Sequence, residues 1–403
     1  MGTNIWLFHH YADPPGGTWL GSHEQYRHLL KFGNKITIFS SNYNHYSHDN
    51  LVKLDGKNHK IKTFEGLRYV IVKTHPYKKN GYHRLLNMIS YAINCYRIAE
   101  SMKDNPDVVI ATTPHPFSVF AGLLFAKKRK RKFVIELHDL WTEYIYDSSK
   151  KYITKLIVKL LRKFDSYIYK QADNIFYLWQ NMDKYLVSLG CDETKLKWTP
   201  LGVDNFITPQ MIDDRKNKFI VTCTARFGPA SNLIEILKSA KVISDLNEPN
   251  IEFIMAGGGP EKKTLEDYCR MNRLENVKFP GMIKKSEIPQ LLSESDVLIA
   301  TLPNIRHYNI YGTIPTKLID YMASGKPTIF ISGINNNVVD ISKGGFSIFP
   351  GEIDKIVKTI LYLKNVSFDK FLQFGNNGVE YVKNNHFLPQ LAQNIDNYLK
   401  NFS

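Results

Sequence analysis

The feature that most constrains the fold of this chain is a repeated alternation of short β-branched stretches with longer helical ones. In the first half, the expected strands are 4–8, 35–40, 70–73, 108–111, 133–137 and 174–177. In the second half, they are 219–224, 251–256, 277–279, 297–300, 328–331 and 345–348. Strands that alternate with helices usually form a parallel sheet with helices on both faces. The sequence therefore predicts an α/β chain with two doubly wound, Rossmann-like units.

The length of the chain agrees with two domains, because 403 residues exceed the roughly 100–200 that one domain usually holds. We expect a first domain over 1–205, a second over 206–384, and a C-terminal helix in 385–403 that crosses back to the first. The polar stretch 208–218 is expected to be a linker. Two such domains would face each other across a cleft, into which loops at the carboxyl ends of the strands would point.

Composition excludes several classes of protein. A hydrophobic content of 43% is enough for sizeable cores and argues against a mainly disordered chain. The four cysteines form no CxxC pair, so neither a disulfide framework nor a zinc knuckle is indicated. The first ten residues lack the basic region of a signal peptide, and no uncharged apolar run reaches membrane-spanning length. We expect a cytoplasmic protein, soluble or bound to a membrane surface.

The positive charge is concentrated in the first half of the chain. The formal net charge is +15, with 53 Lys and Arg against 38 Asp and Glu. Residues 1–200 hold 30 of these basic and 17 of these acidic residues, a net of +13, which leaves +2 for residues 201–403. Such an asymmetry points to an anionic partner for the first half: nucleic acid, anionic lipid or a phosphorylated acceptor.

Two segments supply much of this charge. One is an uninterrupted basic run of Lys127, Lys128, Arg129, Lys130, Arg131 and Lys132. The other, 150–170, has apolar residues at helical spacing beside a lysine every four residues: Lys151, Lys155, Lys159 and Lys163. Such a helix suits an anionic membrane interface, although it could equally be a domain helix with an apolar core face and a solvated lysine face. With no acidic counterweight beside the two segments, we favour the membrane. A nucleic-acid patch lacks a supporting motif.

Glycine-rich turns offer candidate phosphate sites. The chain has neither G-x-G-x-x-G after its first strand nor G-x-x-x-x-G-K-[ST], which argues against dinucleotide oxidoreductases and P-loop enzymes. Gly16 and Gly17 instead stand between a strand and a helix, where their amides could approach an anion. The stretch 256–261, with Gly258 at its centre, follows a strand and opens a helix. Both could also be ordinary turns.

The segment 311–327 is the strongest local candidate. We expect Thr316 to cap a helix, with the helix N-terminus and Lys317 forming a diphosphate site. Asp320 would accept hydrogen bonds from ribose hydroxyls, although Lys317 and Asp320 could also be plain surface residues. His138 and Asp139 follow strand 133–137 and are placed to face the cleft. A single pair of this kind is more often structural than catalytic.

Taken in order, several segments together resemble one family. They include FHHYADPPGGTWLGSH (8–23), PDVVIATTPHP (106–116), IELHDLW (135–141), FGPASNL (227–233), GGGPEKKTLE (257–266) and YGTIPTKLIDYMASGKP (311–327). The chain resembles the family 4 retaining glycosyltransferases of the GT-B fold, and among them the WbuB-like bacterial enzymes that build O-antigen and capsule. This likeness extends over nearly the whole chain.

The resemblance implies a role for individual residues. Gly16 and Gly17 match the loop that closes over the donor diphosphate, His138 the histidine near the transferred sugar, and Asp139 the acid beside it. The implied donor-binding residues of the second half are Arg226, Gly258, Gly281, Thr313, Ile314, Pro315, Thr316, Lys317 and Asp320. Asp320 occupies the second acid of the family's Glu-x7-Glu pattern. The chain departs from the family at Gly312, which replaces the first acid, and at Ser231, which replaces a lysine.

The implied reaction is retaining transfer of a sugar to a polyprenyl-diphosphate-linked saccharide at the inner face of the plasma membrane. The donor would be a nucleoside diphosphate sugar, with UDP-N-acetyl-L-fucosamine as the WbuB-like choice. No DxD triplet occurs, so neither an obligatory metal nor another cofactor is implied. A GT-B sugar-nucleotide epimerase, which needs no acceptor, and a basic nucleic-acid-binding protein remain as alternatives.

Overall fold

The computed structural model describes residues 2–15, 21–45, 47–78, 81–149, 151–207, 213, 215, 217–248 and 250–401. The chain divides into two compact units. The first comprises Met1–Leu201 together with Leu388–Ser403, and the second comprises Gly202–Phe387. Each unit has its own sheet and its own core.

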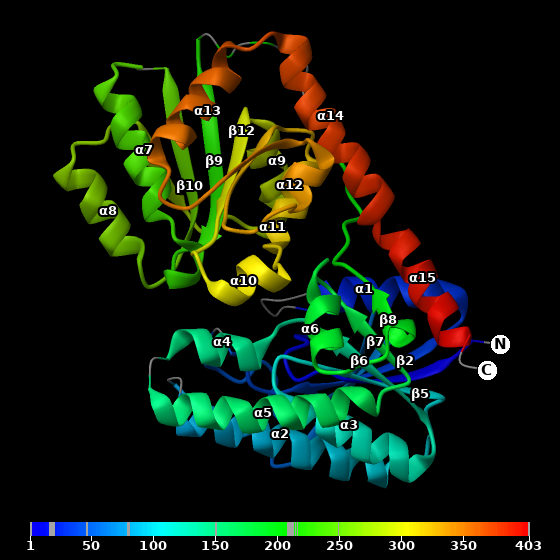
Figure 1. The fold of residues 1–403 in the computed structure, drawn as a ribbon. Helices are drawn as coiled ribbons and strands as arrows, with labels where there is room; N and C mark the ends of the chain where they lie inside the picture. Colours follow the sequence, from blue (N-terminus) through cyan, green and yellow to red (C-terminus); the bar gives the residue numbers. More distant parts are fainter. Residues whose placement is uncertain are drawn as a thin grey trace. The chain divides into compact units, whose positions relative to one another are not determined.

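The first unit is built on a sheet whose described strands run in the order β3-β4-β2-β1-β5-β6-β7-β8 (Figure 1). These strands are β1 (Asn4–Phe8), β2 (Lys35–Ser41), β3 (His59–Phe64), β4 (Leu67–Val72), β5 (Val108–Thr112), β6 (Lys132–Leu137), β7 (Asn174–Tyr177) and β8 (Leu196–Trp198). Their pairing is parallel except between β3 and β4. The alternation did not predict β3, whose outer position leaves it partly exposed and without an apolar signal, or the short β8.

Helices cover both faces of this sheet. On one face lie α1 (Gly21–Leu29) and α15 (Leu388–Lys400), and on the other α2 (Tyr82–Ser101), α3 (Pro116–Arg129) and α5 (Tyr152–Lys170) (Figure 1). Shorter helices are α4 (Trp141–Ser148), α6 (Met182–Ser188), η1 (Leu30–Phe32) and η2 (Glu193–Lys195). The C-terminal helix α15 places Ala392, Ile395 and Leu399 in the core of the first unit. Its Asp396 accepts a hydrogen bond from Asn34 at 2.7 Å.

The second unit has a parallel sheet in the order β11-β10-β9-β12-β13-β14 within the described residues. The strands are β9 (Phe219–Arg226), β10 (Ile251–Gly258), β11 (Val277–Gly281), β12 (Val297–Thr301), β13 (Thr328–Ile331) and β14 (Gly345–Ile348). All of them were expected from the sequence, and the predicted α/β class with two Rossmann-like units is confirmed.

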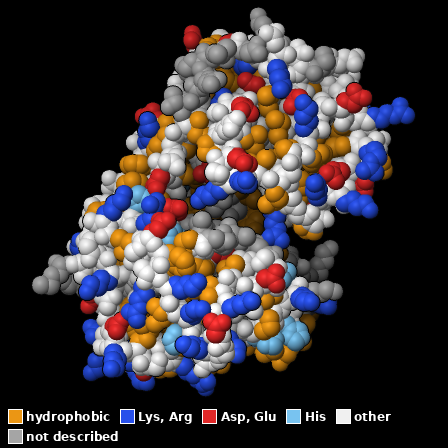
Figure 2. Space-filling model, turned by 180° about the vertical axis from the view of Figure 1, so that it is seen from behind, with side chains coloured by type: hydrophobic (Ala, Val, Ile, Leu, Met, Phe, Trp, Pro, Cys, Tyr) orange, Lys and Arg blue, Asp and Glu red, His pale blue; other side chains and the backbone are white. Residues whose placement is uncertain are grey.

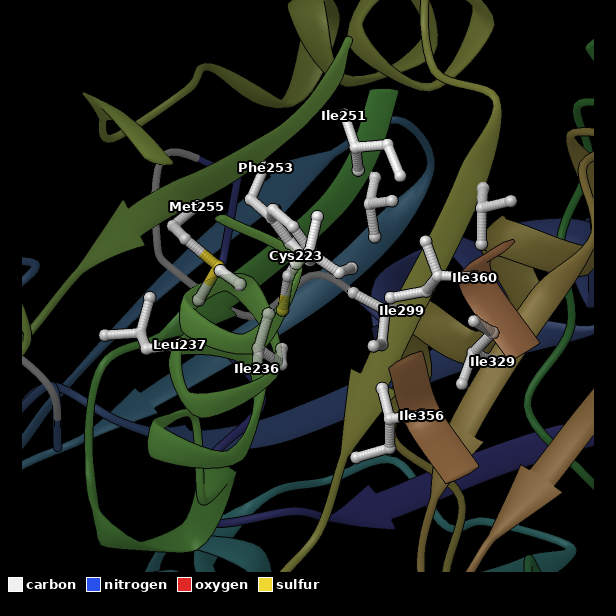
Figure 3. Close-up of a cluster of buried hydrophobic side chains, with 14 of the residues drawn as sticks. Cys223, Ile236, Leu237, Ile251, Phe253, Met255, Ile299, Ile329, Ile356 and Ile360 are labelled. Atoms are coloured by element: carbon white, nitrogen blue, oxygen red, sulfur yellow. The ribbon is translucent and has the colours of Figure 1, made fainter. Parts of the chain in front are cut away.

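The helices of the second unit also form two layers. The helices α7 (Ile234–Asp245), α8 (Lys262–Met271) and α13 (Ile353–Asn365) pack into the core shown in Figure 3. There Cys223, Phe253 and Ile299 from the strands meet Ile236 and Ile356 from the helices. The other layer consists of α9 (Ile288–Ser293), α11 (Thr316–Ala323), α12 (Val338–Ser342) and α14 (Phe368–Asn385). The remaining elements are α10 (Arg306–Tyr311), η3 (Pro229–Ser231) and η4 (Lys285–Glu287).

The expected linker is partly integrated into the second unit. Arg215 is buried and donates a hydrogen bond to the carbonyl of Leu363 at 2.9 Å. Its guanidinium lies 4.4 Å from the ring centroid of Phe371. Arg215 of the expected linker 208–218 is therefore anchored to the second unit, while 208–212, 214 and 216 lie outside the described residues. In the part of the chain that is described, no helix is both long and apolar enough to cross a membrane.

Gly257 provides a test of the packing at the end of β10. Its φ is +141°, and a Cβ there would lie 1.8 Å from the carbonyl oxygen of Ala225. We expect Gly257→Ala to cost about 2–3 kcal/mol of unfolding free energy, measured by urea denaturation. Gly228→Ala is the matched control, because its nearest atom would be 4.0 Å away and its φ is −156°. Equal stability of the two variants would contradict this account.

Candidate functional site

In the first unit, polar side chains gather where β1, β5 and β6 end. His9 and His10 follow β1, Thr113 and His115 follow β5, and His138 follows β6. Since these three strands are parallel neighbours, their carboxyl ends meet at one edge of the sheet. The hydroxyl of Thr113 accepts hydrogen bonds from the backbone N–H groups of His138 at 2.8 Å and Asp139 at 3.3 Å. This fixes the path of the chain immediately after β6.

His138 is buried beside a carboxylate. Only 8% of it is exposed, and its Nε2 lies 3.2 Å from Oε2 of Glu136. The ring of His9 meets the His138 ring edge to face at 5.3 Å between centroids. Asp139 is exposed to solvent, yet the protein around it restricts its solvation and raises the pKa of its carboxyl to about 6. The sequence pointed to His138 and Asp139 but not to His9 or Glu136.

A second histidine pair was also not singled out from the sequence. His10 Nδ1 lies 2.6 Å from His115 Nε2, and the His10 ring stacks between Tyr11 and Tyr91. Burial lowers the pKa of His115 to about 3, and burial together with the neighbouring His115 lowers that of His10. Both imidazoles are therefore neutral at pH 7. The only sequence signal for this pair was its place directly after two apolar strands.

The short helix α4, which begins just after Asp139, is bound to α5 by buried polar groups. Glu143 receives two hydrogen bonds of 2.7 Å from Arg162, and Thr142 donates one of 2.5 Å to Asp165. Burial raises the pKa of Asp165 to about 6. These contacts connect the segment that carries His138 to α5. Gly16 and Gly17, the remaining candidates of this half, lie outside the described residues.

In the second unit, the candidate donor residues lie along the carboxyl edge of the sheet. Arg226 is the exposed last residue of β9, Gly258 ends β10, and Gly281 ends β11 with a φ of +86°. The sheet order changes direction between β9 and β12, which is where open α/β sheets bind their ligands. Ser231 stands where the family pattern has a lysine. Its hydroxyl donates a hydrogen bond to the Arg226 carbonyl at 2.8 Å, so the residue stabilises the turn and carries no charge.

The helix α11 starts differently from the sequence prediction. Its N-cap is Pro315, which makes no side-chain cap hydrogen bond, and Thr316 is already the first helical residue. The expected capping by Thr316 is therefore wrong, because Pro315 already holds the extended conformation that precedes the helix. A first turn without a side-chain cap leaves backbone donors for an anion. Lys317 belongs to this turn, and Thr313 and Ile314 form the half-buried loop before it.

One hydrogen bond positions α11, and the backbone conformation of Gly312 accounts for one departure from the family pattern. The Tyr321 hydroxyl accepts a hydrogen bond from the backbone of Thr224 at 2.6 Å, which ties α11 to β9. Gly312 ends α10 with a φ of +78°, a conformation that disfavours a side chain such as glutamate. The side chain of Asp320 is exposed, but the surrounding protein limits the solvation of its carboxyl and raises its pKa to about 6. The positive charge of Lys285 acts in the opposite direction and lowers this pKa.

The basic run is partly neutralised by acidic neighbours. Glu100 pairs with Lys128 at 2.5 Å and with Arg129 at 3.1 Å, and Asp173 pairs with Lys132 at 3.3 Å. The expectation of no acidic counterweight is therefore wrong for this run, because residues distant in sequence fold against it. Figure 2 nevertheless shows many Lys and Arg side chains along the lower edge of the first unit.

On α5, most of the apolar residues predicted to share one face do not lie in the core, although Leu161 and Phe164 are half-buried. Tyr152 is 84% exposed, Ile153 65% and Leu160 62%, and Leu156 and Ile157 are exposed as well. The helix packs inward through Val158, Asp165, Ile168 and Tyr169 instead. All four predicted lysines, Lys151, Lys155, Lys159 and Lys163, are exposed too. The helix thus presents apolar and cationic side chains together to its surroundings.

Comparisons with known proteins agree with this architecture. Residues 15–205 match the model named Glycosyltransferase Family 4, and residues 207–380 match the model named Glycosyl transferases group 1. Fold and matches together define a GT-B glycosyltransferase. The chain belongs to the glycosyltransferases of family 4 and is an enzyme that transfers sugars, as its sequence predicted. A comparison with curated proteins finds no match.

Several solved structures share the fold over the full length. HepE from Anabaena, in complex with UDP and glucose, is 15% identical with a TM-score of 0.69, covering 100% of both chains. Sucrose-phosphate synthase from Thermosynechococcus elongatus is 15% identical with a TM-score of 0.76, covering 99% of this chain and 98% of that one. TarM from S. aureus is 12% identical with a TM-score of 0.68, covering 98% and 99%. At such identities the likeness concerns the fold.

The neutral histidine pair predicts a specific sensitivity to acid. Below pH about 6.5, the unfolded chain protonates His115 while the folded chain does not until pH about 3. Folding stability should therefore fall as the pH drops through this window. Between pH 7 and pH 5, we expect the wild type to lose about 2 kcal/mol more unfolding free energy than His115→Gln. The exposed His83→Gln should behave like the wild type; identical pH dependence in all three proteins would refute the assignment.

Proposed function

We propose that this enzyme transfers a sugar, with retention of configuration, from a UDP-linked sugar to a polyprenyl-diphosphate-linked saccharide. The observation that carries the proposal is the set of anion-binding groups at the carboxyl edge of the second sheet. Arg226, Lys317 and the uncapped first turn of α11 stand there on elements tied together through Tyr321. HepE, which shares the fold, has been solved with UDP and glucose, and this supports a uridine nucleotide donor.

The chemistry follows from where charge develops. As the bond between the sugar and the diphosphate breaks, negative charge grows on the leaving phosphate, and Arg226, Lys317 and the N-terminus of α11 would stabilise it. The acceptor hydroxyl attacks on the same face and gives its proton to the departing phosphate. Asp320 would hold the ribose hydroxyls, while His138 and Asp139 would contact the transferred sugar. No step in this scheme needs a metal ion or another cofactor.

The acceptor side of the proposal rests on α5. A helix that exposes Tyr152, Ile153 and Leu160 beside four lysines has the character of an interfacial membrane helix. It would hold the first unit against the anionic inner face of the plasma membrane, where a lipid-linked acceptor resides. The resemblance to WbuB-like enzymes adds N-acetyl-L-fucosamine as donor sugar and O-antigen or capsule synthesis in a bacterium as the setting.

Substitution of the two cations tests the donor site. Arg226→Ala and Lys317→Ala should each lower kcat about 100-fold or more, because each removes a charge that is most needed in the transition state. Turnover is measured with a panel of UDP- and GDP-sugars and a polyprenyl-diphosphate acceptor, after a screen for thermal stabilisation. Arg270→Ala and Lys358→Ala on exposed helix surfaces serve as controls. Near-normal rates in both site variants would overturn the assignment, and donor conversion without acceptor would favour an epimerase.

The membrane proposal has its own test. Replacing Lys155, Lys159 and Lys163 with Gln should weaken binding to phosphatidylglycerol vesicles about 100-fold, at about 1 kcal/mol for each lysine. Sedimentation with vesicles measures this binding. A triple variant of Lys278, Lys284 and Lys355 removes the same charge from exposed sites of the second unit and should bind normally. Equal losses in both triples, or equal binding of the wild type to neutral vesicles, would argue against docking through α5.

A further inference from the structure

We infer that Glu136 is a positioning residue for His138: its carboxylate favours the tautomer in which Nε2 carries the proton and points toward Glu136, which leaves Nδ1 as the hydrogen-bond acceptor. The inference deepens the proposed function, since it rests on His138 contacting the transferred sugar. It concerns which ring nitrogen carries the proton, a property that can be observed without any turnover.

The strand places the two side chains together. Glu136 and His138 are two residues apart at the end of β6, so their side chains point to the same face. The nearest atoms, Nε2 of His138 and Oε2 of Glu136, are 3.2 Å apart. The distance is within hydrogen-bond range, although the N–H is not aligned for a straight hydrogen bond. Such misalignment is common in unliganded sites, where contacts tighten when substrate binds.

The burial of Glu136 makes this contact energetically significant. The residue is 1% exposed, and a carboxylate that is removed from water must be compensated by donors. In the described part of the chain, its oxygens receive hydrogen bonds of 3.2 Å from Gln25 Nε2 and from the Tyr26 hydroxyl, both on α1. These two donors are neutral. The Nε2 atom of His138, 3.2 Å from Oε2, is placed to provide a third donor.

The other neighbours of His138 favour the same arrangement. The buried His9 ring faces it, and burial together with His138 lowers the pKa of His9, so His9 remains neutral. Asp139 follows His138 directly and is exposed, whereas Glu136 is enclosed. A carboxylate beside an imidazole commonly fixes the tautomer and the orientation of the ring. Here Gln25 and Tyr26 hold the carboxylate, and the carboxylate in turn holds the ring.

The experiment combines NMR of ¹⁵N-histidine-labelled full-length protein with kinetics. In the wild type, the His138 ring should show the Nε2–H tautomer, with its signals assigned through His138→Gln. In Glu136→Gln, the tautomer populations should shift and kcat should fall about 10- to 100-fold, with little change in the KM for the donor. Glu136→Asp keeps the charge and should restore part of both. Asp396→Asn is the matched control, because this buried carboxylate accepts a hydrogen bond from Asn34 at 2.7 Å elsewhere in the first unit.

The outcomes separate this inference from the proposed function. An Nδ1–H tautomer in the wild type would overturn the inference, even if Glu136→Gln fails to fold. Unchanged tautomer populations and kcat in a folded Glu136→Gln would overturn it as well. If instead Glu136→Gln shifts the tautomer while His138→Gln retains full activity, Glu136 does position the ring, but the proposed role of His138 in sugar transfer is wrong.

Discussion

The parallel pairing of the central strands is the constraint on which both candidate sites depend. In the first unit β1 pairs with β2 on one side and β5 on the other, and in the second unit β9 pairs with β10 and β12. Where the strand order reverses, the connections that follow the two neighbouring strands run to opposite faces of the sheet. The loops after these strands therefore diverge and expose the backbone between them. His9 and His10, which follow β1, occupy this position in the first unit, and Arg226, which ends β9, occupies it in the second. His138 follows β6, the next strand beyond β5.

The two units use their strand ends in different ways. The first has the buried, neutral imidazoles of His9, His10 and His115 and one enclosed carboxylate, Glu136, at this edge. The second presents the exposed Arg226 and the partly exposed Lys317 near a helix N-terminus. A site with little net charge suits a sugar with many hydroxyl groups, and a cationic edge suits a diphosphate. This contrast agrees with the division of labour between acceptor and donor domains that we propose.

Much of the fold was predictable because parallel strands buried on both faces have continuous apolar sequences, as in Val108–Thr112 and Val297–Thr301. The outer strand β3 was not, since its half-exposed residues carry no such signal. Among the candidate site residues, Lys317 was singled out through its local motif and Arg226 through the family resemblance. Glu136 was not, because its partners on α1 lie more than a hundred residues away in sequence. The pairing of the basic run with Glu100 and Asp173 was hidden for the same reason.

The position of α15 has a consequence for how the protein is made. This helix follows the whole second unit in sequence, yet Ala392, Ile395 and Leu399 complete the core of the first. In topological terms, the second unit is an insertion within the first. Domains usually fold as they leave the ribosome, the N-terminal one first. Here the unit that begins the chain must wait, with one face of its sheet incompletely covered, until the unit inserted in it has been synthesised.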